Sequence, residues 1–338
     1  MTLKASLHVH QAGPGVSVQD SGRVGWLAQG LSKGGAADRL ALAEGAALLG
    51  QPVAAALEMA GFGGRFSVTA QTRIALTGAP MRASVDGVPL RWQASHLLSA
   101  GAILDIGGCL EGAYGYLTVG GGFALPDILG APSAHLSAGL GRTLAQGDRL
   151  PLMPDPGGPV GYGLNVAPRW SGGTLRILPS LQTPLFDQTE LERFCTTGFT
   201  RDARANRMGL RLLPDGSGFA LTGGQSILSE VVVPGDVQVP GDGAPYVLLY
   251  ECQTTGGYPR IGTVIPCDLS LAAQTPAGAA LRFRFVTRAE ALDAEKRHHV
   301  HVSDLTRSAY PLVRNPADIP DLLSYSLISG VTTGEETD

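Results

Sequence analysis

The sequence contains very little lysine and little charge of either sign. Its 338 residues include only Lys4, Lys33 and Lys296, and charged residues make up 16% of the chain, with a formal net charge of −4. Proteins that bind nucleic acid through its phosphates need a concentration of positive charge. The composition therefore argues against a nucleic-acid partner.

Long apolar runs and paired cysteines are also missing. No segment reaches the length of a membrane span, and the N-terminal stretch lacks the apolar core of a secretory signal. We therefore expect no membrane association and a soluble, cytoplasmic protein. Because no cysteine pair has the spacing of a zinc or redox motif, we expect reduced, partly buried thiols at Cys109, Cys195, Cys252 and Cys267.

Three motifs that would identify a reaction directly are absent. No GxxxxGK[ST] sequence occurs, so the chain does not bind ATP through a P-loop. The GxSxG elbow of many serine hydrolases is missing as well. No methionine flanks a lysine as at a biotin attachment site, so no biotin is expected on this chain.

Two groups of histidines could be considered as metal ligands, but each is incomplete. His298, His299 and His301 follow a charged helical pattern, and His8 and His10 alternate as on one face of a strand. A zinc site needs a further ligand from elsewhere in either case. We predict a solvated helix end for the first group, surface exposure for the second, and no metal site.

What the chain does contain is abundant glycine and proline, 47 and 23 residues, spread along its whole length. Such punctuation favours many short strands joined by turns. Asp86-Gly87 is a hairpin signal. Short apolar or alternating runs predict strands at 65–70, 73–77, 82–85, 102–106, 116–119, 174–178, 229–233, 246–250, 262–265 and 281–286.

Helical patterns are few. Residues 38–49 can begin with Asp38 as a cap and stop at Gly50, and 190–195 and 288–297 are further candidates. The fold class is therefore mainly β, in two barrel-like lobes with a few short helices. We expect a lobe over 1–155, a join near 154–163, a second lobe over 165–300 and an extension over 301–338.

Two polar segments stand out among the turns. In VQDSGRVG (18–25), an amide, a carboxylate and a guanidinium lie close together, either as a functional group of side chains or as a pair, Asp20 and Arg23, that fixes a loop. In ECQTTGGYPRIGTVIPCD (251–268), hydroxyls, an amide, Tyr258 and Arg260 surround two glycines. That turn could aim donors at a developing anion, or could be a hairpin with capped hydroxyls.

These segments resemble one known family. The chain resembles the KipA-like family in the segment VQDSGR followed by Asp38. That family includes the C subunit of 5-oxoprolinase and the matching part of urea carboxylase. The similarity covers roughly residues 10–290. The other matching segments, in the same order, are 55–58, 74–81, 117–123, 139–150, 206–212, 229–249 and the highly specific QTTGGYPRIGTVI at 253–265. The chain departs from the family pattern at 32–35, at Ala46 and Gln51, and at 131–134.

The resemblance implies cyclophilin-like β-barrels and a place in a multi-subunit enzyme. The implied partners are two further subunits, one KipI-like and the other LamB/YcsF-like, with ATP and magnesium bound at the level of the complex. The implied reaction is ATP-driven hydrolysis of 5-oxo-L-proline to L-glutamate. Two alternatives are a biotin-dependent carboxyltransferase acting on urea or another amide, and a regulatory protein that binds a KipI-like kinase inhibitor.

Hydrolysis of a lactam through phosphorylation of its oxygen needs cations and N–H donors around that oxygen. Arg23, Arg207 and Arg260 are candidate anion contacts, and candidates for positioning water or a proton are Asp20, Asp38, Glu58 and Glu230. Candidate substrate-binding residues are Gln19, Gln238, Gln253, Thr254, Thr255, Gly256, Gly257 and Tyr258.

Overall fold

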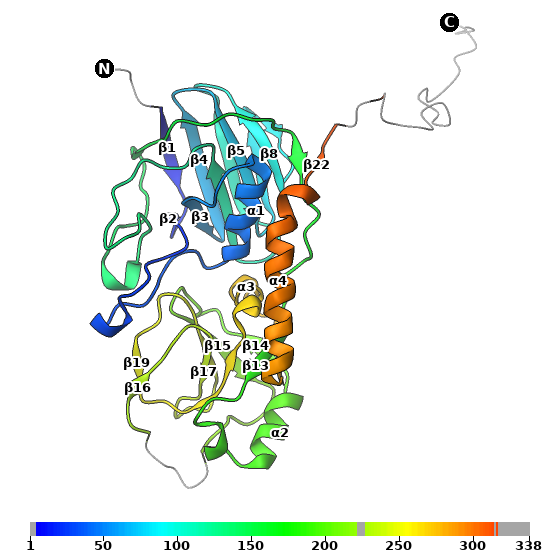
Figure 1. Cartoon of the computed structure of the whole chain (residues 1–338). Coiled ribbons are helices and arrows are strands. Elements are labelled where there is room, and N and C mark those ends of the chain that lie inside the picture. The colour runs from blue at the N-terminus through cyan, green and yellow to red at the C-terminus, as the bar shows by residue number, and fades with distance from the viewer. Residues whose placement is uncertain (1–4, 222–226, 314–315, 317–338) are drawn as a thin grey trace, which may run out of the picture.

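The computed structural model describes residues 5–221, 227–313 and 316, and these form two β-rich lobes stacked one above the other (Figure 1). The predicted mainly β class is confirmed. The second lobe is a closed barrel, whereas the first lobe consists of two open sheets. The expectation of two barrels therefore holds in full for the second lobe only.

The first lobe contains a six-stranded and a seven-stranded sheet. The six-stranded sheet has the order β11 (Arg149–Pro151), β1 (Ser6–Ala12), β4 (Phe62–Val68), β9 (Leu104–Cys109), β6 (Met81–Val85) and β7 (Val88–Pro89). The seven-stranded sheet has the order β2 (Ser17–Gln19), β3 (Ala56–Ala60), β10 (Tyr114–Val119), β5 (Thr72–Gly78), β8 (Ala94–Leu98), β12 (Tyr162–Gly163) and β22 (Tyr310–Pro311).

The turn between β6 and β7 is the hairpin that the sequence predicts. Asp86 and Gly87 both have positive φ, 48° and 83°. Two consecutive left-handed residues match the right-handed twist of the flanking strands, which is why Asp-Gly is favoured there.

The barrel closes through one parallel pair. Its strands follow one another around the barrel as β13 (Gly173–Leu178), β20 (Arg260–Val264), β17 (Asp236–Gln238), β18 (Tyr246–Leu248), β15 (Gly209–Pro214), β14 (Phe199–Arg201) and β21 (Ala280–Phe285). β13 and β21 run parallel, and their pairing closes the ring. Beside the barrel, β16 (Glu230–Val231) and β19 (Thr255–Gly256) form a small two-stranded sheet.

Four phenylalanine side chains pack together in the core of the barrel. The cluster consists of Phe194, Phe199, Phe219 and Phe283. The centroids of contacting rings lie between 4.7 and 5.8 Å apart. The barrel core continues into the first lobe through Ala36, Leu42, Tyr114 and Tyr116. Because one apolar cluster joins the lobes, they pack as one body.

Four α-helices occur in the described residues: α1 (Arg39–Leu49), α2 (Gln188–Thr196), α3 (Leu269–Gln274) and α4 (Arg288–Ser308). α1 begins and ends as predicted, since the Asp38 carboxylate accepts from the amide of Ala41 at 3.2 Å and Gly50 adopts φ 60° after the last turn. Short 3₁₀ turns occur at Leu27–Gln29, Leu136–Ala138, Thr183–Leu185 and Pro266–Asp268.

The predicted end of the last helix is wrong. The helix was expected to stop near residue 297, but α4 continues to Ser308, so His298, His299 and His301 lie inside it. Leu305 explains the extension, because it is buried in an apolar cluster of the first lobe together with Ala47, Leu48 and Leu164. Tertiary packing of an apolar side chain stabilises turns that local propensity leaves marginal.

The chain crosses between the lobes twice. It leaves the first lobe after β12 and enters the barrel at β13, and it returns along α4 to β22, which pairs with β12 (Figure 1). Residue 300, where the sequence suggested a boundary, lies within α4.

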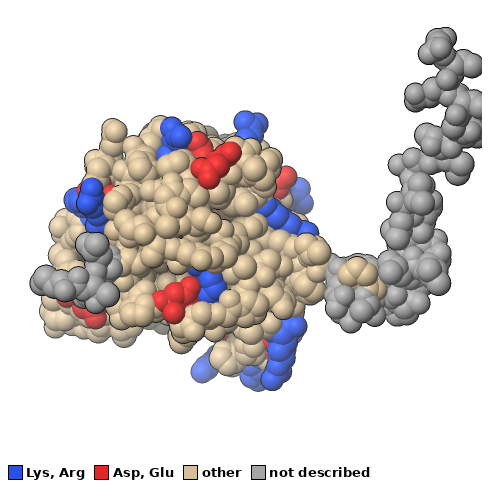
Figure 2. Space-filling model, turned by 90° about the horizontal axis from the view of Figure 1, so that it is seen from above, with Lys and Arg blue, Asp and Glu red and all other residues tan. Residues whose placement is uncertain are grey.

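Charged side chains are sparse on the surface seen from above. On the face shown in Figure 2, Lys and Arg lie mainly at the margins, and uncharged residues cover most of the described surface. This distribution is consistent with the low charge content of the chain.

Candidate functional site

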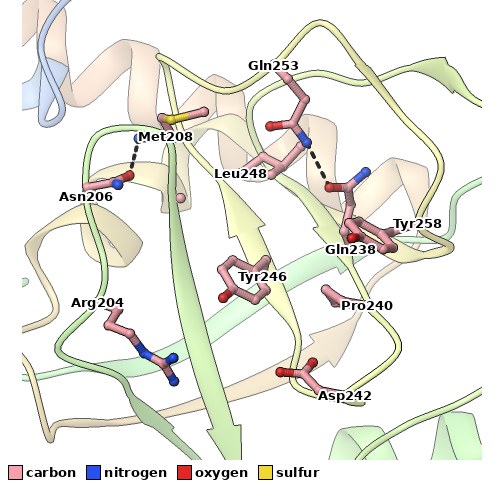
Figure 3. Close-up of a pocket in the computed structure, with 11 residues that line it drawn as sticks. Arg204, Asn206, Met208, Gln238, Pro240, Asp242, Tyr246, Leu248, Gln253 and Tyr258 are labelled. Carbon is pink, nitrogen blue, oxygen red and sulfur yellow. Dashed lines mark hydrogen bonds between the residues drawn. The ribbon is translucent and has the colours of Figure 1, made fainter. Parts of the chain in front are cut away.

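A cavity of about 370 Å³ opens on the barrel where β15, β17 and β18 meet the loop before β15 and the loops after β17 and β18 (Figure 3). This volume is within the range of small-molecule sites. The wall combines polar and apolar side chains, and the lining residues are Arg204, Asn206, Met208, Gly209, Gln238, Pro240, Asp242, Tyr246, Leu248, Gln253 and Tyr258.

Gln238, at the end of β17, is the most deeply buried polar group of the cavity. Its side chain is 2% exposed, and its Oε1 accepts a hydrogen bond from Gln253 Nε2 at 3.1 Å. Gln238 Nε2 is buried and has no hydrogen-bond partner among the described residues. A buried amide without a partner costs free energy, so such a group is a natural donor for a ligand oxygen.

Gly256 makes room for the Gln238 amide. A Cβ atom at this position would lie 2.4 Å from Gln238 Nε2 and 3.3 Å from a methyl group of Val232. The first distance is too short for both atoms to stay in place, so a side chain at this position would displace the Gln238 amide. The turn therefore both forms β19 and shapes the cavity.

Charges at the rim of the cavity are paired. Asp242 accepts from Arg211 Nη2 at 2.5 Å, and this hydrogen bond lowers the pKa of the Asp242 carboxyl. Arg204 pairs with Asp202 at 2.7 Å. Tyr258 is half exposed at the mouth, where its ring can cover a bound molecule.

Arg260 and Glu230 lie beside the cavity and bind each other. Arg260 Nη2 donates to Glu230 at 2.5 Å, and Nη1 donates to Asp236 at 3.3 Å and to the carbonyl of Val231 at 3.1 Å. These contacts attach β16 to the barrel wall. The position supports a role in holding the β16–β19 sheet, and the guanidinium does not line the cavity.

Arg207 and Glu58 form an ion pair between the lobes. Glu58 also accepts from Tyr116 Oη and from the amide of Ala37, each at 2.7 Å. Arg207 Nε donates to Glu251 at 2.6 Å. Burial would raise the pKa of Glu251, but Arg207 outweighs it and holds that pKa below its ordinary value.

Asp38 belongs to a second buried network at the same interface. It is fully buried, caps α1, and accepts from Arg169 Nε and Gln274 Nε2, both at 2.8 Å. Arg169 also binds Glu44 with two hydrogen bonds, although burial raises the pKa of the Glu44 carboxyl. The Asp38 carboxylate does not line the cavity on the barrel.

Arg23 is a buried clamp between two loops of the first lobe. It is 1% exposed and donates to the carbonyls of Ile128 at 2.8 Å, Ala131 at 3.1 Å and Ser133. Asp20 accepts from the amide of Gly22 at 2.6 Å instead of pairing with Arg23. An anion contact at Arg23 is not supported by this geometry, because its donors are already taken.

The substrate-binding candidates separate into two groups. Three of them, Gln238, Gln253 and Tyr258, line the cavity. The adjoining residues of the turn lie beside the cavity without lining it, and these are Thr254, Thr255, Gly256 and Gly257. Gln19 is instead buried in the first lobe, where its Nε2 donates to Ser17 Oγ at 2.9 Å. None of the seven charged candidates lines the cavity.

Several lining residues were not singled out by the sequence: Arg204, Asn206, Met208, Asp242 and Tyr246. All but Arg204 fall within 206–212 or 229–249, two segments that carry the family resemblance. The side chains themselves have no catalytic signature. These residues could have been found from the segments 206–212, 229–249 and 253–265, because all three contribute to the same cavity.

The described residues contain no group of three or more His, Cys, Asp or Glu side chains placed to hold a metal ion. Within that same part of the chain, no helix combines the length and apolar character needed to cross a bilayer. The four cysteines are free, and burial raises the pKa of the Cys252 thiol to about 12.

Sequence comparison places close relatives over most of the chain. Residues 29–285 match the family described as carboxyltransferase domain, subdomain A and B. A protein of Escherichia coli named as the C subunit of 5-oxoprolinase is 35% identical over 298 residues, which is 86% of this chain and 94% of that protein. The protein of the same name from Haemophilus influenzae is 32% identical over 296 residues, with the same two shares.

Solved structures share the fold. The crystal structure of TTHA0988 has a TM-score of 0.76 and 30% identity over 83% of this chain, which spans 56% of that longer chain. The crystal structure of Kluyveromyces lactis urea carboxylase has a TM-score of 0.78 and 21% identity, covering 94% of this chain and 31% of that chain. The second likeness concerns the fold alone.

Proposed function

The chain belongs to the carboxyltransferase subdomain A and B family, and from this premise we propose that it is the C subunit of an ATP-dependent 5-oxoprolinase, which hydrolyses 5-oxo-L-proline to L-glutamate. Support comes from the two relatives that carry the name of this 5-oxoprolinase component, each matched over 94% of its length. A match over nearly the whole of a relative favours a shared role in the same kind of complex.

The observation that carries the proposal is Gln238, whose side chain lines the barrel cavity and whose buried Nε2 has no hydrogen-bond partner among the described residues. A lactam resists attack by water because its nitrogen lone pair is delocalised onto the oxygen. Donors placed where negative charge develops on that oxygen lower the barrier to attack or to phosphorylation. Gln238 supplies such a donor, Gln253 fixes its orientation through Oε1, and Tyr258 lies at the cavity mouth.

ATP and magnesium are proposed to be held by the complex rather than by this chain alone. The sequence has no P-loop, and the charged rim residues of the cavity, Arg204 and Asp242, already have protein partners. The proposed partners are a KipI-like protein and a LamB/YcsF-like protein, the B and A components of the enzyme. We place the complex in the cytoplasm, where ATP is supplied.

Under this proposal the charged candidates Asp38, Glu58 and Arg207 hold the lobes together, so their effect on turnover is indirect. Asp20 and Arg23 shape the loops of the first lobe, and Glu230 and Arg260 hold the β16–β19 sheet against the barrel. The remaining reacting groups are supplied by the partner proteins.

Carboxyl transfer is the alternative reaction. We retain it because the chain shares its fold with urea carboxylase. Both reactions place negative charge on an amide-type oxygen, so one donor set could serve either. The chain itself has no biotin attachment sequence. Carboxyl transfer would require a biotin carrier as a further partner.

The test is to co-purify the chain with its candidate KipI-like and LamB/YcsF-like partners and to measure ATP-dependent glutamate release from 5-oxoproline. The chain alone should release none. Gln238→Met keeps the size of the side chain and removes the donor, so we expect turnover to fall about a hundredfold.

The matched control is Gln71→Met, because Gln71 lines a different cavity, in the first lobe. It should leave turnover and the thermal midpoint unchanged. Full activity of Gln238→Met would remove this cavity from the reaction. Glutamate release by the single chain at the rate of the complex would overturn the composite enzyme.

A further inference from the structure

A second group of reactive side chains lies away from the barrel cavity, where two loops of the first lobe meet the second lobe. Ser32 Oγ is 2.9 Å from His135 Nε2. His135 Nδ1 is 3.2 Å from Ser137 Oγ and 4.0 Å from a carboxylate oxygen of Glu251. Ser32, His135 and Glu251 are each at least 96% buried.

The contacts of Ser137 favour one assignment of the proton on the His135 ring. Ser137 Oγ donates to the carbonyl of Glu251 at 3.1 Å, so it is free to accept from Nδ1–H of His135. The other nitrogen, Nε2, then presents its lone pair to Ser32 Oγ–H. This is the arrangement in which a histidine can remove the proton of a serine hydroxyl.

Glu251 supplies the third element of such a group. Its carboxylate lies near Nδ1 and is held in place by Arg207 Nε at 2.6 Å and by the amide of Ser137 at 3.0 Å. A fixed negative charge at this position stabilises the imidazolium that forms when His135 takes up the serine proton.

Ser32 lines a cavity of about 180 Å³ that opens between the two lobes. Most of its wall is apolar, and Lys33 also lines it. The apolar lining residues are Val24, Trp26, Leu27, Leu31, Val232, Val233 and Pro234. A small and mostly apolar cavity of this kind suits a short acyl chain.

We propose that Ser32 is a nucleophile activated by His135 and that it accepts the acyl group of a short-chain ester. Ser32 Oγ forms a bond to the acyl carbon while its proton moves to His135 Nε2. The ester's C–O bond breaks, and the departing alkoxide takes that proton and leaves as the alcohol. Water then attacks the acyl-serine, giving the free acid and restoring the Ser32 hydroxyl. This activity is independent of the function proposed for the barrel cavity.

The molecule contains a matched control for this site. His10 Nε2 and Ser67 Oγ are 2.8 Å apart on the first lobe, so they form a serine–histidine pair with comparable geometry. His10 is exposed on its strand, and neither residue lines the barrel cavity or the cavity beside Ser32. If distance alone activated a serine, this pair would react as well.

The experiment treats the full chain with a fluorophosphonate probe, maps the modified peptide by mass spectrometry, and measures hydrolysis of p-nitrophenyl acetate. The adduct should lie on Ser32. Ser32→Ala should abolish labelling, and His135→Asn should slow it by about a hundredfold or more, the scale of general-base catalysis. Ser67→Ala should label at the normal rate.

Mapping on the folded wild-type chain tests the site even if a variant is unstable, and thermal midpoints show which variants fold. An adduct on any other residue, or no adduct on Ser32, would overturn the proposal. So would a folded His135→Asn variant that labels as fast as the wild type.

Discussion

Gly256 is the residue at which one added methyl group should disturb the barrel cavity most directly. Its missing Cβ leaves the space that the Gln238 amide occupies, at 2.4 Å. We expect Gly256→Ala to displace that amide and to reduce turnover of the reconstituted complex at least tenfold, because catalytic donors must keep their position closely.

Gly257→Ala is the neighbouring control. At that position the nearest atom to an added Cβ is the carbonyl oxygen of Ile227 at 3.5 Å, an ordinary contact. Its turnover should stay near the wild-type value. Equal losses in both variants would mean that the turn, rather than the Gln238 amide, is what the substitution disturbs.

The residue scale also shows what the sequence could not specify. The residues of the QTTGGYP segment could be recognised from their order, but the partners of single charges could not. Arg23 bonds Ser133, Arg169 bonds Asp38 and Arg207 bonds Glu58, with each partner more than a hundred positions away. The environment of a charge depends on such distant contacts. From the sequence alone, an arginine on a loop therefore cannot be assigned to anion binding or to hydrogen bonding with backbone carbonyls.

At the scale of elements, the start of α1 is tied to the interface between the lobes. Asp38 caps this helix and also accepts from Arg169 and Gln274, and all three residues are buried. We expect Asp38→Ala to reduce the free energy of unfolding by about 3 to 5 kcal/mol, since it removes a cap and leaves a buried guanidinium with one partner fewer.

Asp187→Ala is the comparison for this substitution. Asp187 occupies the same position at the start of α2, but its side chain makes no cap hydrogen bond and is exposed. Its loss should change stability by about 0.5 kcal/mol or less. Chemical denaturation of both variants measures the difference, and similar values for the two would show that the Asp38 network contributes little.

Elements with local signals were predictable, and those defined by distant pairing were not. α1 has its cap and its terminal glycine within the segment itself, and the β6–β7 hairpin has Asp86 and Gly87. The length of α4 depends on the burial of Leu305 against the first lobe. Closure of the barrel depends on the parallel pairing of β13 with β21. The sequence of either strand does not indicate this partner, because the two strands are far apart along the chain.

For the whole molecule, the Glu251 carboxylate between the lobes predicts sensitivity to acid. Burial opposes ionisation of Glu251, but Arg207 outweighs it and holds the Glu251 pKa below its ordinary value of 4.5. A depressed carboxyl pKa stabilises the fold at pH values above the unfolded pKa, and this contribution is lost as the pH falls through the folded pKa. We expect the urea midpoint to be steady near neutrality and to fall below about pH 4.5.

Glu251→Gln should lower stability at neutral pH and make it less dependent on pH in the acid range, because the titrating group is gone. Asp293→Asn, at an exposed position on α4, should behave as the wild type. An unchanged acid profile in Glu251→Gln would show that the Arg207 network does not couple protonation to folding.

The double crossing between the lobes has a mechanical consequence. The barrel is inserted into the first lobe, attached once between β12 and β13 and again by α4. A rigid body connected at two points can rotate only about the axis that passes through both connections. An opening of the lobes would have to break the apolar cluster that joins them, and it would be confined to one axis. The barrel cavity would turn with its lobe as a unit, whereas the walls of the smaller cavity, at 23–33 and 232–234, would part.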